Sequence, residues 1–278
     1  MDKITTYIDQ QGVVKTGGSL GSAFKNFQSE FAIVKYIIGT ELRIKVFDKT
    51  LGYIFLFLEP LLMASVYYVL TMVVLGSKMG NFGFMDLYVA VVFWRWFSRT
   101  VDNAPALFNT YGTVLKQTNF SVYSITIAYL GMEFINLLLS MVVLVIFLGL
   151  FGFYPNPNYL LIPLIMLSQL SLMVFLTILA SVGGAFLKDL QGILYAFVAI
   201  WFYMSPGIYP VGNIPDKYLW VYNLNPFAHI LPAYRSILLR GETPDFDVLG
   251  IMFLLFSVLA FIALKLLAKA RYHFFSYL

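Results

Sequence analysis

The chain has 278 residues, of which 60% are hydrophobic and 12% are charged, with a formal net charge of +4. Ordinary soluble proteins carry about 25% charged residues, and disordered chains are poor in the aromatic residues that are abundant here. No cysteine is present, which excludes disulfides, iron-sulfur clusters and thiolate-bound metals. Between Glu133 and Lys188 lie 54 uncharged residues, and about 20 apolar residues cross a bilayer as one helix. The composition therefore predicts an all-α polytopic membrane protein.

Residues 1–50 are predicted to form a cytoplasmic N-terminal segment, because they mix polar and charged residues and contain no signal-peptide pattern. Within it, Phe31, Val34, Ile38 and Leu42 recur at near-helical spacing. This pattern favours an amphipathic helix that lies at the membrane interface. Lys35 interrupts its apolar side, so a solvated helix that caps the bundle is the alternative.

Residues 51–278 are predicted to form one transmembrane domain of six spans. The proline at position 60 is expected to kink the first of them. A Tyr-Pro-Asn-Pro turn at 154–157 divides the long uncharged stretch, and Lys188-Asp189 forms a short connection after the fourth span. The six expected spans are 51–75, 84–107, 128–151, 159–186, 190–204 and 248–267.

The basic residues predict the orientation of these spans. Twelve of the eighteen Lys and Arg residues fall on the side that would hold both termini, and four fall on the opposite side. Loops rich in Lys and Arg stay in the cytoplasm. Both termini are therefore expected to be cytoplasmic.

The segment 206–245 is unusual for an external loop, because its 40 residues include six prolines and many apolar side chains. This composition predicts short re-entrant helices that dip into the outer leaflet before the last span. Irregular backbone at membrane depth is tolerated only inside protein or beside a cavity. We expect an external gate, with an ordinary packed cap as the alternative.

The chain offers little for catalysis or metal binding. Its two histidines, His229 and His273, are far apart, and no metalloprotease, hydrolase or nucleotide-binding signature occurs. We therefore expect a transport subunit without enzymatic activity, without a metal site and without a cofactor of its own. Any ATP and Mg²⁺ would be bound by a partner.

Ionisable residues inside the second span are costly and predict function. Arg95, Arg99 and Asp102 follow one another at i, i+4 and i+7, which places them on one helix face. We expect an ion pair between Arg99 and Asp102. Arg95 would then meet an anionic substrate group or reach Glu59 or Glu133.

Aromatic residues are dense near the expected membrane boundaries. Interface girdles explain many of them, but aromatic faces also stack on the apolar faces of sugar rings. On the second interpretation they line a wide glycan channel. The residues assigned to that lining are Tyr67, Tyr68, Trp94, Arg95, Trp96, Phe97, Arg99, Glu133, Trp201 and Tyr203.

Three stretches resemble the ABC-2 type permeases of polysaccharide exporters, which move O-antigen, capsule or teichoic acid chains. The first contains Glu41-Leu42-Arg43, Lys49 to Tyr53 and Leu58-Glu59-Pro60-Leu61, the second covers 109–120, and the third contains Ser205 to Pro210, Ile214-Pro215 and Asn223 to Pro226. The resemblance implies a homodimer in a bacterial inner or plasma membrane, assembled with two copies of a cytoplasmic ATPase that binds ATP and Mg²⁺.

The resemblance also implies roles for individual residues. The segment 109–120 would couple to the ATPase, through Asn109, Tyr111, Leu115, Lys116 and Phe120. The external gate would include Pro206, Tyr209, Pro210, Trp220, Asn225, Pro226 and Phe227. A lipid-linked glycan would enter beside the first span, with its pyrophosphate near Arg43, Lys45, Lys49 and Tyr53.

The function predicted from the sequence is ATP-driven export of a lipid-linked polysaccharide by the permease subunit. An ABC-2 exporter of a drug or a lipid is the first alternative. A secondary transporter is less favoured, because no internal repeat is visible. A membrane glycosyl or acyl transferase lacks its acid-base pair.

Overall fold

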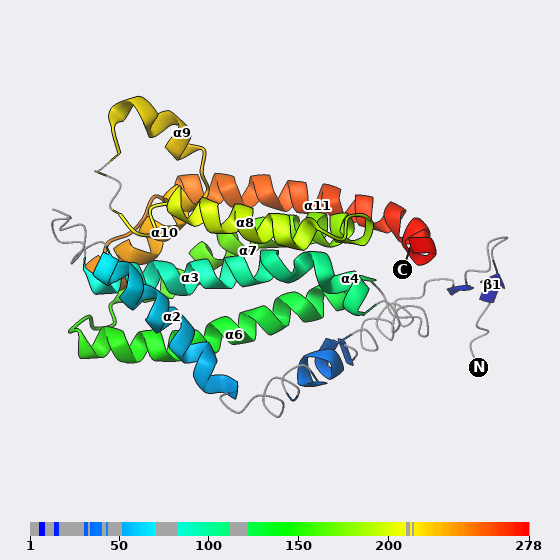
Figure 1. Ribbon diagram of the computed structural model, residues 1–278, viewed down its shortest axis with the longest axis horizontal. Coiled ribbons are helices and arrows are strands. Elements are labelled where there is room, and N and C mark those ends of the chain that lie inside the picture. Colours follow the sequence, from blue (N-terminus) through cyan, green and yellow to red (C-terminus); the bar gives the residue numbers. More distant parts are fainter. Residues whose placement is uncertain are drawn as a thin grey trace.

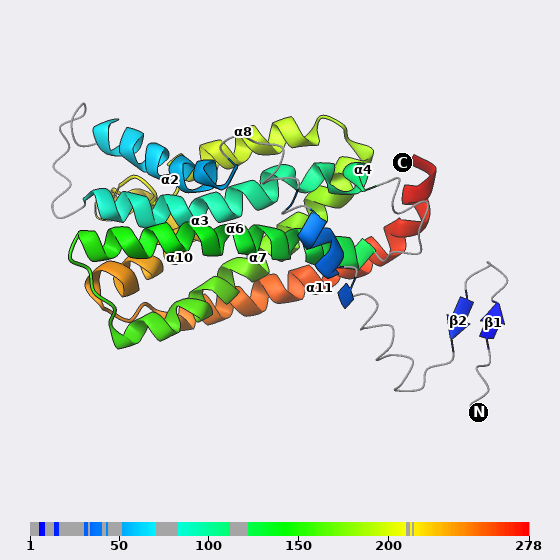
Figure 2. The same cartoon turned by 90° about the horizontal axis from the view of Figure 1, so that it is seen from below.

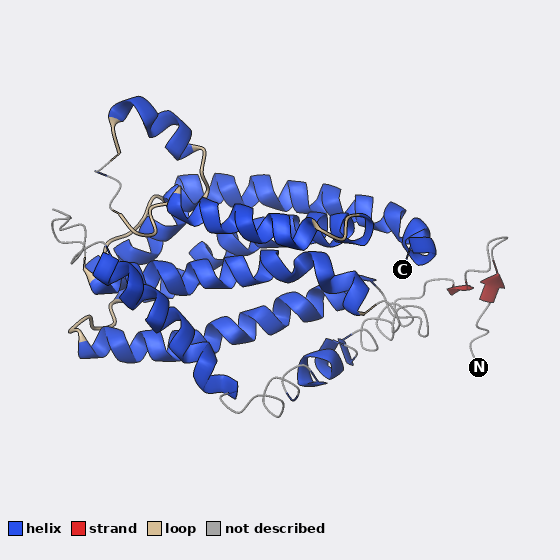
Figure 3. Cartoon of the chain, viewed as in Figure 1, coloured by secondary structure: helices blue, strands red, loops and turns tan. Residues whose placement is uncertain are grey.

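The computed structural model describes residues 6–8, 14–16, 31–32, 34–40, 43, 52–70, 83–111, 122–209, 212 and 214–277. Most of this part of the chain is helical (Figures 1 and 3). The long helices are α2 (Gly52–Tyr68), α3 (Phe84–Asn103), α6 (Val122–Leu150), α7 (Ile162–Phe186), α8 (Leu190–Tyr203) and α11 (Phe246–Tyr277). The short ones are η2 (Ala104–Ala106), α4 (Leu107–Thr110), η3 (Pro157–Leu161), η5 (Asp216–Tyr218), α9 (Leu219–Asn223), α10 (Phe227–Arg235) and the π-helical η6 (Ser236–Arg240).

Three helical stretches are long and apolar enough to cross a membrane. They are Val122–Leu150, Pro157–Phe186 and Phe246–Leu267, and at most half of each apolar window is buried inside the protein. Exposed apolar surface of this kind is stable in lipid but not in water. The chain is therefore an integral membrane protein with a helical fold, as the composition predicts.

The remaining long helices lie beside these three. α2 and α8 are shorter, with 17 and 14 residues, and Pro60 lies inside α2. α3, α6, α7, α8 and α11 run along the long axis of the bundle, and α2 crosses obliquely (Figures 1 and 2). The observed boundaries lie within a few residues of the predicted ones in the fourth and fifth spans. They differ in the second and third spans and at the end of α11, which continues to Tyr277. The predicted end of the first span, at 75, falls outside the described residues.

α3 is the centre of the bundle. Fifteen of its twenty residues are buried, and it contacts α2, α6, α7, α8 and α10. Its sequence is apolar on all sides apart from a few ionisable residues, which is typical of a helix enclosed by other helices. Functional side chains on α3 are consequently held in a rigid position.

One end of the bundle, called here the α10 end, carries the short helices between α8 and α11 (Figure 1). α10 packs against α3 and α7, and it continues into η6, which ends at Gly241. Gly241 adopts a left-handed conformation with φ of 69°, which glycine accepts without a steric penalty. The opposite end, called the α4 end, contains α4 and the connection from α7 to α8.

The N-terminal part differs from the all-helical expectation in one detail. β1 (Thr6–Ile8) and β2 (Val14–Thr16) form a small antiparallel hairpin, with Ile8 opposite Val14. β-branched residues at most of these positions favour extended backbone. Residues 34–40 are helical as expected; Ile37 is buried while Phe31 and Tyr36 are exposed.

Candidate functional site

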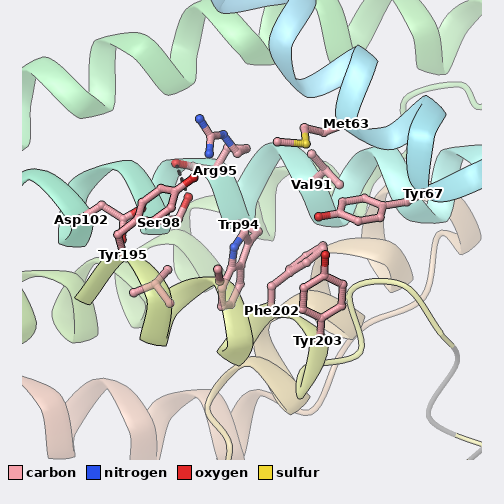
Figure 4. Close-up of a pocket in the computed structure, with 12 residues that line it drawn as sticks. Met63, Tyr67, Val91, Trp94, Arg95, Ser98, Asp102, Tyr195, Phe202 and Tyr203 are labelled. Atoms are coloured by element: carbon pink, nitrogen blue, oxygen red, sulfur yellow. Dashed lines mark hydrogen bonds between the residues drawn. The ribbon is translucent and has the colours of Figure 1, made fainter. Parts of the chain in front are cut away.

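A cavity of about 220 Å³ lies between α2, α3 and α8, and we call it the aromatic cavity (Figure 4). Its walls carry tyrosine, tryptophan and phenylalanine rings together with one arginine, one serine and one aspartate. Its lining residues are Met63, Tyr67, Val91, Trp94, Arg95, Ser98, Asp102, Tyr195, Val198, Ala199, Phe202 and Tyr203.

Helical periodicity explains how the sequence builds this cavity. On α3, Val91 is followed by cavity residues at i+3, i+4, i+7 and i+11, which form one stripe along the helix. On α8, Tyr195 is followed by cavity residues at i+3, i+4 and i+7. Two straight stripes therefore face each other, with Tyr67 of α2 closing the side near the α10 end (Figure 4).

A second cavity of about 640 Å³ lies at the α4 end, and we call it the mouth cavity. Asp102 and Tyr195 line both cavities. The other lining residues come from the start of α8, the connection before it and the end of α3: Asn103, Lys188, Asp189, Gln191, Gly192 and Ile193. The two cavities together follow α3 and α8 from the α4 end towards the α10 end.

A cluster of charged residues lies behind the aromatic cavity, between α2, α3 and α6. Arg95 of α3 forms an ion pair and hydrogen bond with Glu59 of α2. Arg99 lies 3.8 Å from a carboxylate oxygen of Glu59 and 3.8 Å from one of Glu133 on α6. Two cations thus face two anions, and Asn136 donates a hydrogen bond to Glu133 over 3.1 Å.

This charge cluster corrects one expectation. Arg99 was predicted to pair with Asp102, but within the described part of the chain Asp102 forms no ion pair and its Oδ1 atom has no hydrogen-bond partner. The physical reason is the reach of arginine, which brings the Arg99 guanidinium to carboxylates on two neighbouring helices. The alternative in which Arg95 reaches Glu59 is confirmed.

Only some of the residues assigned to a channel lining come together. Tyr67, Trp94, Arg95 and Tyr203 line the aromatic cavity. Arg99 and Glu133 belong to the charge cluster, and the other four pack elsewhere: Trp96 against Phe134, Phe97 and Trp201 against Phe227, and Tyr68 against Phe84. A role in a channel stays a prediction for all ten.

Ser98 and Tyr195 are cavity residues that the sequence interpretation did not single out. Tyr195 precedes Phe202 by seven positions, and Ser98 lies between Arg95 and Asp102 on one stripe. Helical spacing from Phe202 would have found Tyr195. Ser98 carries no such signal, because a single serine in an apolar helix is common.

The residues assigned to the external gate surround the last turn of α8. Asn225 accepts a hydrogen bond from Trp201 Nε1 over 2.9 Å and donates one to Ser205 Oγ over 2.9 Å. Its Oδ1 also accepts from the backbone N–H of Phe227, which is fully buried. One side chain thereby joins the end of α8 to the start of α10.

A second group, which we call the Arg235 clasp, consists of Arg235, Asp86, Pro206 and Gly207. The buried guanidinium donates to the backbone carbonyls of Pro206 over 2.5 Å, Gly207 over 2.6 Å and Asp86 over 2.8 Å. It therefore fixes the segment after α8 against the first turn of α3. Arg240 pairs with the Asp86 carboxylate over 3.3 Å.

The other gate residues are distributed differently. Pro206 is buried, Tyr209 and Pro226 are half-buried and Trp220 is 70% exposed, while Pro210 lies outside the described residues. Burial raises the pKa of the Tyr209 hydroxyl above its ordinary value.

The predicted coupling and access residues are described only in part. Asn109 of α4 donates a hydrogen bond to the Gly184 carbonyl of α7 over 3.4 Å, and Tyr111 lines a cavity of about 210 Å³ beside Ile37 and Tyr129. Arg43 is exposed, and Tyr53 lies in the first turn of α2. Leu115, Lys116, Phe120, Lys45 and Lys49 lie outside the described residues.

Comparison with known proteins agrees with this arrangement. Residues 33–239 match the ABC-2 type transporter family. An O-antigen export system permease protein RfbA of Klebsiella pneumoniae is 26% identical over 245 residues, which are 88% of this chain and 94% of that protein. The protein of the same description from Myxococcus xanthus is 27% identical over 241 residues, covering 86% and 92%. The chain belongs to the ABC-2 type transporter family, as a permease homologous to O-antigen export permeases.

Proposed function

We propose that the protein is the permease subunit of an ATP-driven exporter that moves a lipid-linked polysaccharide out of the cytoplasm. The observation that carries this proposal is the pair of neighbouring cavities along α3 and α8, which share Asp102 and Tyr195 in their linings. Tyr195 lines both cavities and is 65% exposed, and aromatic faces of this kind stack on the apolar faces of sugars. The names of the relatives, which are O-antigen export permeases, support a glycan cargo.

In the proposed topology, α2, α3, α6, α7, α8 and α11 are six spans in a bacterial inner or plasma membrane. The 17 residues of α2 extend about 26 Å, close to the hydrocarbon thickness of about 30 Å. Both termini and the α4 end face the cytoplasm, and the α10 end is external. The excess of basic residues on the side of the termini supports this orientation.

A second copy of the chain completes the channel. Apolar side chains on α2 and α8 flank the aromatic cavity yet remain exposed, among them Val66 at 62%, Ile193 at 62% and Phe197 at 57%. Two such faces around a common axis would enclose the open side of both cavities, because a symmetric dimer buries the same surface on each copy.

Energy comes from a cytoplasmic ATPase, which binds ATP and Mg²⁺. The coupling residues Asn109 and Tyr111 lie at the α4 end, directly before the segment 112–121. A push on this segment reaches α7 through the hydrogen bond between Asn109 and Gly184. At the opposite end, the Arg235 clasp and Asn225 hold the external gate closed until that push arrives.

The cargo would enter beside the first span. Its pyrophosphate would meet the basic side chains of Arg43, Lys45 and Lys49, since arginine and lysine bind phosphate through charge-assisted hydrogen bonds. Replacing all three with Gln should reduce export while co-purification with the ATPase stays unchanged. Unchanged export in this variant would contradict the proposed access site.

The function itself is tested by deleting the gene and measuring glycan on the cell surface and lipid-linked glycan in the cytoplasmic leaflet. The proposal expects surface glycan to disappear and its precursor to accumulate. The ATPase subunit should co-purify with the protein, and vanadate should inhibit its ATP hydrolysis. If the deletion strain keeps normal surface glycan but loses drug resistance or fails to export a lipid, the cargo is a drug or a lipid. That result would contradict the proposed glycan cargo.

A further inference from the structure

Asp102 lies where the aromatic cavity and the mouth cavity meet. It belongs to the lining of both cavities, together with Tyr195 on the facing helix. Figure 4 shows Asp102 and Tyr195 side by side, so a chain that moves from the mouth cavity into the aromatic cavity passes close to both. The position alone makes Asp102 a contact for whatever moves along this path.

The carboxylate of Asp102 also has unused hydrogen-bonding capacity. Its Oδ1 atom is buried and has no hydrogen-bond partner in the part of the chain that the structure describes. A buried polar atom without a partner costs free energy, so such atoms in native proteins call for a ligand, water or ion. Arg99, the expected partner, is held instead by Glu59 of α2 and Glu133 of α6.

The surrounding groups indicate the chemistry of the partner. A carboxylate accepts hydrogen bonds, and an aromatic ring opposite offers an apolar face. A sugar ring satisfies both, because its hydroxyls donate while its C–H face stacks. Tyr195 is 65% exposed within the single chain, so its face is available for this contact.

The charges along the path disfavour acidic cargo. In the mouth cavity the described lining carries one ammonium group, Lys188, against the two carboxylates of Asp102 and Asp189. In the aromatic cavity the guanidinium of Arg95 is neutralised from behind by Glu59. A sugar carboxylate in the mouth cavity would therefore meet more carboxylates than cations, and like charges at close range repel.

We propose that Asp102, facing Tyr195 at the junction of the two cavities, is a cargo contact that selects neutral, hydroxyl-rich glycans over acidic ones. The proposal rests on the proposed function, because it deepens the substrate class of the same path. The side chain acts by accepting a hydrogen bond from a passing sugar hydroxyl. A glycan rich in uronic acids is excluded by the same carboxylate.

The test uses the full-length chain in lipid nanodiscs with two probes of matched length, maltoheptaose and heptagalacturonate. Binding is measured by saturation-transfer NMR. The wild type should bind maltoheptaose at least about tenfold more tightly than the acidic probe, since a charge-assisted hydrogen bond contributes roughly one decade of affinity. Asp102→Ala should weaken maltoheptaose binding by about tenfold.

Asp102→Asn separates charge from hydrogen bonding. The amide oxygen still accepts a hydrogen bond, so maltoheptaose affinity should stay within about threefold, while heptagalacturonate affinity rises by about tenfold as the repulsion disappears. Asp247→Asn removes the same charge at the start of α11, outside both cavities, and should change neither affinity. Tyr195→Ala, at an exposed position, should weaken maltoheptaose binding as well.

Three results would overturn the inference: equal wild-type affinity for both probes, unchanged preference in Asp102→Asn, or no maltoheptaose binding by the wild type. The wild-type preference between the two probes keeps the test decisive if the Asp102 variants fail to fold. Loss of surface glycan on gene deletion, measured separately, reports on the exporter itself. If gene deletion abolishes surface glycan but Asp102→Asn keeps the wild-type preference, the role of Asp102 is refuted and the proposed export function is not.

Discussion

Glu59 of α2 forms an ion pair with Arg95 of α3, and Arg95 also lines the aromatic cavity, so one arginine belongs both to an ion pair and to the cavity wall. The pair crosses the boundary between the oblique first helix and the central helix. It explains why an acidic residue directly before Pro60 is tolerated within an apolar helix: its charge is neutralised by a partner on the neighbouring helix.

We expect Glu59→Gln to lower the free energy of unfolding by about 1–3 kcal/mol, because it leaves Arg95 and Arg99 short of one carboxylate. Both side chains of the Glu59–Arg95 pair keep about a fifth to a quarter of their surface exposed, which limits the loss. Thermal unfolding in detergent measures it. Arg240→Gln is the comparison, since Arg240 is 48% exposed in its pair with Asp86 and should cost about 1 kcal/mol or less. Equal losses would contradict the importance of the charge cluster.

Gly184 of α7 is predicted to be intolerant of any side chain. A Cβ atom there would overlap the backbone of Pro105 in η2, and backbone cannot move aside as a flexible side chain can. Gly184→Ala should destabilise the protein by about 1–3 kcal/mol. Gly250→Ala in α11 meets no atom within 4 Å and should stabilise by up to about 1 kcal/mol. The melting temperatures of the two variants should therefore move in opposite directions, and a parallel shift would disprove the close contact.

Tyr234, Gln169 and Phe93 form a buried polar contact between α10, α7 and α3. Tyr234 donates to Gln169 Oε1 over 3.0 Å, and Gln169 Nε2 donates to the Phe93 carbonyl over 2.9 Å. Gln169→Leu should cost about 1–3 kcal/mol because it strands the Tyr234 hydroxyl. Adding Tyr234→Phe should recover part of that loss, which a double-mutant cycle measures. Strict additivity of the two changes would contradict direct coupling.

The Arg235 clasp is predicted to control leakage through the external gate. Arg235→Lys keeps the charge but cannot donate to the Pro206, Gly207 and Asp86 carbonyls in the same fork geometry. We expect a loss of about 2–4 kcal/mol in stability and faster escape of a small entrapped solute from vesicles that contain the protein. Lys217→Met, on the exposed η5, should leave the escape rate unchanged. An Arg235→Lys variant that loses stability without faster escape of the solute would show that the clasp is structural only.

The sequence predicts most of the helix order because each helix that crosses the lipid needs a stretch of about 20 apolar residues. The uncharged stretch divided at Tyr154–Pro157 leaves no alternative to two helices, and Lys188-Asp189 marks a sharp connection. Helix ends are less predictable. Positions 104–106 continue α3 as a short 3₁₀ turn because Pro105 interrupts the α-helical hydrogen bonds.

The site is harder to predict, because a helical pattern shows which face a residue occupies but not how far its side chain reaches. Arg99 and Asp102 share a face by spacing, yet Arg99 extends to Glu59 and Glu133 on two other helices. The aromatic residues present the same difficulty. Trp94 and Trp96 are two positions apart, and only Trp94 faces the aromatic cavity.

The Arg235 clasp has a consequence for biosynthesis. Arg235 follows Asp86 by 149 positions, so the two meet only after five of the six proposed spans have left the ribosome. Until then the first turn of α3 lacks the donor that joins it to the segment after α8. A chain truncated before Arg235 should insert its early helices but leave the α10 end without the clasp, so closure of this end is a late step of assembly.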